Sequence, residues 1–225
     1  MNFQKLKKLN SKLKQTYEDY ISMIAVGSIV TEDPHIKNRS DNDIVLIFEK
    51  VFSSRPSNIE DILSSFDFDE SYVFTPLPKS EFGIPFGKYS FSNKFRSKNL
   101  FGKDLIKKAK LPNYEQSKKI YLKGLNSTIH QVENNLTNSK IWDIDKIKDK
   151  FWKQFKHAFM YLAIREYCLS GEYPKTRKEI TTKINMPKLK ETFEVLHNIN
   201  NKSHVEITNC SKKLSKMLHK FISQP

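Results

Sequence analysis

The first twenty residues have the hydrophobic pattern of an amphipathic helix, with lysines on its other face. The apolar positions follow intervals of three and four, namely Leu6, Leu9, Leu13, Tyr17 and Tyr20. This spacing places side chains on one face of a helix. The pattern therefore predicts a helix over residues 3–20 that packs against a core.

Three short apolar runs predict strands. Residues 22–26 and 43–48 are apolar and partly β-branched, which is typical of buried strands, and the segment between them is polar and predicts a loop. Residues 70–76 predict a third strand, which Pro76 and Pro78 would end.

Between the second and third runs, Ser57 and Glu60 have the spacing of a capping box and predict the start of a helix. The segment from about residue 77 to 105 is rich in glycine and proline. It predicts irregular structure, with a short strand or helix near residues 88–99.

After residue 113 the apolar residues keep a helical period almost to the end of the chain. Phe151, Phe155 and Phe159 share one helical face, and this spacing predicts core packing in a bundle more strongly than stacking on nucleic-acid bases. The fold class is therefore α+β. We expect a small mixed-sheet domain over residues 1–110, followed by an all-α, basic helical domain over residues 111–225.

Positive charge is concentrated in the second half of the sequence. Residues 1–100 contain 14 lysines and arginines against 13 acids, whereas residues 101–225 contain 25 against 12, and the formal net charge of the chain is +14. Such a field attracts polyanions such as RNA or nucleotides and repels cationic substrates. An AT-rich genome would also raise the lysine content without any binding role, and that alternative stays open.

The sequence predicts a soluble, cytoplasmic protein that does not enter a membrane. It contains no run of about 18 apolar residues, and its N-terminus lacks the apolar segment of a secretory signal.

The candidate chemistry lies in residues 25–49, AVGSIVTEDPHIKNRSDNDIVLIFE. Asp41 and Asp43 are two residues apart at the start of an apolar strand, so their side chains project to the same face. Two such carboxylates repel each other unless a cation lies between them, and a pair of oxygen ligands suits Mg²⁺. Gly27 allows close approach of the backbone to a ligand, and Ser28 adds a hydroxyl.

A strand, Gly-Ser, a polar loop and then SDNDIVLIF resemble the nucleotidyltransferase superfamily related to DNA polymerase beta. More weakly, residues 95–105 and the segment GEYPKTRKEI are similar to minimal or antibiotic-type nucleotidyltransferases. The resemblance implies that the mixed-sheet domain binds a nucleoside triphosphate with Mg²⁺ or Mn²⁺. It further implies that Gly27 and Ser28 contact the phosphates, and that Asp41 and Asp43 are catalytic residues that hold the metal.

The same resemblance implies a third carboxylate from a later strand. Glu70 is our prediction for this catalytic position, with Asp67 and Asp69 as neighbouring alternatives. The alternative is that all three acids are solvent-exposed residues at the start of the strand with no catalytic role.

Three functions fit these features. The first is an enzyme that transfers a nucleoside monophosphate to a hydroxyl of RNA, such as a tRNA end held by the basic half. The second is an enzyme that adenylylates a hydroxyl of a protein or small molecule. The third is a non-catalytic nucleotide-binding module. The charge pattern favours RNA as the partner. It determines neither which nucleoside triphosphate is used nor the oligomeric state.

Overall fold

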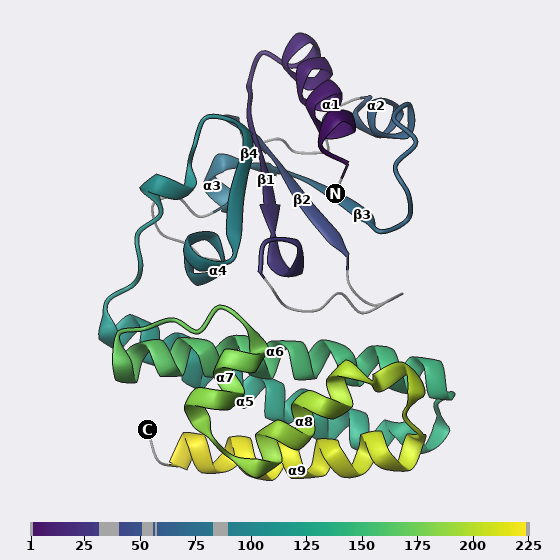
Figure 1. The fold of residues 1–225 in the computed structure, drawn as a ribbon, viewed down its shortest axis with the longest axis vertical. Coiled ribbons are helices and arrows are strands. Elements are labelled where there is room, and N and C mark those ends of the chain that lie inside the picture. The colour runs from purple at the N-terminus through teal and green to yellow at the C-terminus, as the bar shows by residue number, and fades with distance from the viewer. Residues whose placement is uncertain (1, 32–40, 51–55, 57, 83–89, 224–225) are drawn as a thin grey trace. The chain divides into compact units, whose positions relative to one another are not determined.

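The chain divides into two compact units, Met1–Pro112 and Asn113–Pro225 (Figure 1). The computed structural model describes residues 2–31, 41–50, 56, 58–82 and 90–223.

The first unit contains a four-stranded mixed sheet in the order β3-β2-β1-β4. Strand β1 (Tyr20–Val26) is antiparallel to both β2 (Asn42–Phe48) and β4 (Ser97–Gly102). Strand β3 (Tyr72–Pro78) is parallel to β2, which is its one sheet neighbour among the described residues. Apolar side chains alternate between the two faces of β1 and β2, so both faces carry a core.

Helices cover the two faces of this sheet (Figure 1). Helices α1 (Phe3–Thr16) and α2 (Ile59–Ser64) pack on one face, and α3 (Lys79–Phe82) lies on the other, near α4 (Ser90–Phe95) and a 3₁₀ turn at Ile106–Lys108. The α1-side core consists mainly of Leu6, Leu9, Leu13, Met23, Ala25, Ile44, Leu46 and Phe48. The α3-side core consists of Ile24, Val45, Ile47, Phe82 and Leu105.

The second unit is helical throughout its described residues. Its helices are α5 (Tyr114–Asn138), α6 (Ile144–Ser170), α7 (Arg177–Ile184), α8 (Pro187–His197) and α9 (His204–Ser223). Phe151, Phe155 and Phe159 on α6 are at most 1% exposed, so the prediction that this stripe forms bundle core is confirmed. Within the described part of the chain, no helix combines the length and the apolar character needed to cross a membrane.

The predicted α+β fold class, a mixed sheet followed by helices, is confirmed. The expectation that the third strand is stopped at Pro76 is wrong, because β3 continues through Pro76 and has Pro78 as its last residue. In the described part of the chain β3 is an edge strand that pairs on one side, so the missing N–H group of Pro76 need not disrupt the ladder. Ser57 of the predicted capping box lies outside the described residues, and α2 begins after Asn58 without a side-chain cap.

Candidate active site

The predicted site residues of the first half of the chain lie at one end of the sheet. Because β1 is antiparallel to β2 and β4 while β2 and β3 are parallel, β1 ends where the other three strands begin. Across this end, Val73, Asp43, Val26 and Ser97 are consecutive register partners from β3 to β4. We call this the Gly27 end of the sheet, after the first residue beyond β1.

Gly27 starts a 3₁₀ turn, Gly27–Ile29, in a left-handed conformation with φ +74°. Its N–H donates to the carbonyl of Arg96 at 2.9 Å, and its own carbonyl accepts from the N–H of Val30 at 3.1 Å. Among the described residues, a Cβ built on Gly27 would meet only the Oδ2 atom of Asp43 nearby, at 3.5 Å. The turn is thus fixed by its backbone, and the described residue that faces it is a carboxylate.

Asp43 and Asp41 both lie beside this turn. Asp43 is half-buried and is the register partner of Val26, so the β1–β2 ladder fixes its backbone at the end of β1. Asp41 is exposed and precedes the strand, and its carbonyl accepts a long hydrogen bond of 3.4 Å from the Ser28 hydroxyl. The structure therefore brings together the four residues predicted to bind phosphate and metal.

The donor set of this end fits Mg²⁺ bound together with a nucleotide. Among the described residues, no group of three or more His, Cys, Asp or Glu side chains could hold a metal ion by itself. Mg²⁺ commonly takes one or two carboxylates and completes its octahedron with water and substrate phosphates. Asp41 and Asp43 supply such a pair.

Glu70 is not the register neighbour of these aspartates. It is exposed in the turn before β3, whereas Val73 is the β3 residue opposite Asp43. Asp69 caps the same turn: its Oδ1 accepts from the N–H of Ser71 at 2.9 Å and from the Ser71 hydroxyl, and the hydroxyl contact is the main cause that lowers the pKa of Asp69. The role of Glu70 as a third carboxylate stays a prediction.

Arg96 and Ser97, which are not among the predicted site residues, also lie at the Gly27 end. Arg96 does so through its carbonyl contact with Gly27, and Ser97 through its pairing with Val26; the Ser97 hydroxyl donates to the carbonyl of Ser92 at 3.0 Å. Lys103 lies at the opposite end, where its N–H donates to the carbonyl of Ile21 at 3.2 Å. The pairing of β4 with β1 determines where Arg96, Ser97 and Lys103 lie. The local sequence does not predict this pairing.

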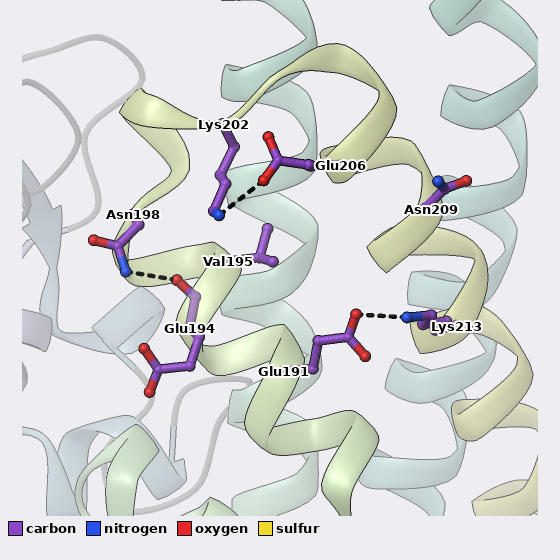
Figure 2. Close-up of a pocket in the computed structure, with 8 residues that line it drawn as sticks. All are labelled: Glu191, Glu194, Val195, Asn198, Lys202, Glu206, Asn209 and Lys213. Atoms are coloured by element: carbon purple, nitrogen blue, oxygen red, sulfur yellow. Dashed lines mark hydrogen bonds and ion pairs between the residues drawn. The ribbon is translucent and has the colours of Figure 1, made fainter.

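The helical unit has a cavity of its own, about 490 Å³ in volume, between α8 and α9 (Figure 2). Two ion pairs span its wall, Lys213 with Glu191 at 2.6 Å and Lys202 with Glu206 at 2.9 Å. Glu194 adds a further carboxylate to the lining. Because both lining lysines pair with glutamates, this cavity does not have the charge of a phosphate site.

No protein-family model matches the chain, and no curated protein matches it in sequence. Among solved structures, the chain is similar to the crystal structure of a spectinomycin adenyltransferase from Enterococcus faecialis with ATP and spectinomycin. The TM-score is 0.54 and the sequence identity 11%, and the match covers 95% of this chain and 99% of that chain. At this identity the likeness shows a shared fold and no more.

Proposed function

We propose that the protein transfers a nucleoside monophosphate from a nucleoside triphosphate to an acceptor hydroxyl, in a reaction that depends on Mg²⁺. The observation that carries this proposal is the meeting of the open Gly27 turn with the two aspartates at one end of the sheet. The nucleotidyltransferase fold, seen in a neighbour with bound ATP, supports the same reaction class.

In this proposal each residue has a distinct task. Asp41 and Asp43 hold the metal, and Gly27 and Ser28 contact the triphosphate through the turn backbone and the serine hydroxyl. Bound Mg²⁺ would neutralise the charge that develops on the phosphates during transfer. Glu70 is the predicted third carboxylate, and an unchanged rate in Glu70→Gln would remove it from the site.

RNA is the acceptor that we propose, because the second half of the chain carries 25 basic against 12 acidic residues. A basic surface can hold a phosphate backbone without recognising its sequence. The second candidate is adenylylation of a small molecule or protein, which the fold shared with a spectinomycin adenyltransferase favours.

Incubation with each of the four α-³²P-labelled nucleoside triphosphates, Mg²⁺, and RNA and protein from the source cell tests these proposals. Label in nuclease-sensitive RNA supports the first acceptor, whereas label in protein, or in spectinomycin supplied separately, supports the second. Binding of Mg-nucleotide without any transfer would instead identify a non-catalytic module.

The double variant Asp41→Asn, Asp43→Asn should lose transfer by at least about 100-fold, the scale expected when groups that stabilise transition-state charge are removed. The matched control is Glu60→Gln, Asp61→Asn, which removes two acidic residues from the first turn of α2 in the same unit. Equal rates in the double variant and the wild type would refute the metal assignment.

A further inference from the structure

Helix α1 carries five lysines and no acidic residue in its 14 residues. The near-neutral count over residues 1–100 conceals this, because the acids that balance the lysines lie elsewhere in the first unit. Glu18 and Asp19, the nearest in sequence, follow the end of the helix.

The lysines of α1 form two rows on its exposed face. Leu6, Leu9 and Leu13 are fully buried against the sheet, which fixes the orientation of the helix. At about 100° per residue, Lys7 and Lys14 fall in one row and Lys8 and Lys12 in a second. The strip between the rows contains only exposed polar residues: Gln4, Ser11 and Gln15.

Within the described part of the chain, no ion pair joins Lys7, Lys8, Lys12 or Lys14 to an acid. Lys5 differs, because its Nζ donates to the carbonyl of Asp67 and lies 5.5 Å from the centre of the Phe68 ring. The two rows therefore present four ammonium groups to solvent, whose mutual repulsion an anionic partner would relieve.

The chemistry of this face selects its partner. A basic amphipathic helix binds a membrane by inserting its apolar side, but the leucines of α1 are already in the core. A peptide partner needs pockets for anchoring side chains, whereas the exposed face of α1 from Gln4 to Thr16 carries only polar and basic residues. A phosphodiester backbone needs only a regular array of positive charges.

We propose that the exposed face of α1, defined by Lys7, Lys8, Lys12 and Lys14, binds the phosphodiester backbone of RNA. This surface lies in the first unit, so it is separate from the basic helical half considered above. It goes beyond the proposed transfer reaction and does not depend on it.

The test is the salt dependence of RNA binding, measured by fluorescence anisotropy with a labelled single-stranded RNA oligonucleotide and without any nucleoside triphosphate. In the variant with all four lysines replaced by glutamine, the slope of log K against log salt concentration should fall by about 3, because each lost contact to a single strand contributes about 0.7. The thermal unfolding midpoint of the variant should stay close to that of the wild type.

The matched control replaces four lysines that already pair with acids, Lys153, Lys183, Lys202 and Lys213. It changes the net charge equally, and its slope should stay within about one unit of the wild-type value. An unchanged slope in the α1 variant, or equal losses in both variants, would overturn the proposal. Polyglutamate, used as a second labelled ligand, tests for an acidic protein partner. If the α1 variant loses binding to polyglutamate but still binds RNA, the proposal is overturned in favour of such a partner.

Because the assay contains no nucleoside triphosphate, its outcome is independent of the transfer test. A catalytically inactive chain that binds RNA through α1 would disprove only the transfer reaction. An active chain whose RNA binding ignores the α1 lysines would disprove only the inference on α1.

Discussion

Gly27 and Gly102 lie at opposite ends of the sheet with nearly the same left-handed backbone, φ +74° and +80°. A Cβ on Gly102 would lie 2.2 Å from the carbonyl oxygen of Ile21 and 2.8 Å from the Cα of Ser22. A Cβ on Gly27 would lie in ordinary contact with the Asp43 carboxylate. The backbone conformation is shared, but the surroundings differ.

Gly102 is therefore required because a side chain would not fit, whereas a side chain at position 27 would meet no backbone of the described residues. Gly102 is the C-terminal residue of β4 and lets two backbone segments approach closely. At Gly27 nothing in the described structure fills the space where a side chain would be, apart from the facing carboxylate. Space beside a fixed turn leaves room for a phosphate, and a cation held by the aspartate would offset the repulsion between the two negative groups.

The largest effect is expected for Gly102→Ala. The new Cβ would collide with backbone, which cannot move aside as a side chain does, and the left-handed backbone would be strained as well, so we expect the free energy of unfolding to fall by about 2–5 kcal/mol. Urea unfolding followed by circular dichroism measures this, and a loss below that of Gly27→Ala would break the comparison.

Gly27→Ala should lower the free energy of unfolding less than Gly102→Ala does, and should weaken nucleotide binding more. Only the left-handed backbone is strained, at about 1–2 kcal/mol. The methyl group would enter the space proposed for the triphosphate, so nucleotide affinity should drop although the protein stays folded. Isothermal titration with a non-hydrolysable triphosphate and Mg²⁺ gives the affinity, and a wild-type value in the folded variant would contradict the assignment.

A smaller effect is expected from removing positive charge at the two ends. The carbonyl of Arg96 lies at Gly27; if its guanidinium also binds a phosphate there, Arg96→Ala should weaken triphosphate binding about tenfold, the loss expected for one charge-assisted hydrogen bond. Lys103→Ala, at the Gly102 end, is the matched control and should bind as the wild type does. Equal affinities in the two variants would show that the ends do not differ electrostatically.

The smallest effect is expected for Ser28→Ala. Its hydroxyl makes one long hydrogen bond, to the Asp41 carbonyl at 3.4 Å, so stability should change by less than about 0.5 kcal/mol. Loss of the proposed phosphate contact should weaken nucleotide binding about threefold to tenfold, as for a single neutral hydrogen bond. A fall in the unfolding midpoint with unchanged affinity would assign Ser28 to the turn alone.

Local pattern predicted the elements that carry the aspartates and the glycine turn. Strand β1 ends at Val26 and β2 runs from Asn42 to Phe48, close to the predicted runs 22–26 and 43–48, because both are continuous apolar segments buried on both faces. The resemblance of residues 21–49 to nucleotidyltransferases depends on these same segments.

Long-range pairing determined what local pattern missed. Strand β4 has the sequence SKNLFG, a weak strand signal, and its place beside β1 brings Arg96 to Gly27. The Asp69–Ser71 turn delays the start of β3 to Tyr72, and its parallel register puts Val73 opposite Asp43. A single sequence does not encode such registers locally.

The hydrogen bond from the Gly27 N–H to the Arg96 carbonyl has a consequence for biosynthesis. The two groups are 69 residues apart in the sequence, so the turn acquires this contact only after β4 has left the ribosome and paired with β1. A nascent chain that ends before Arg96 has both aspartates but lacks the bond that fixes the turn. Nucleotide binding by a nascent chain would therefore report that the segment around Arg96 has joined the sheet beside β1.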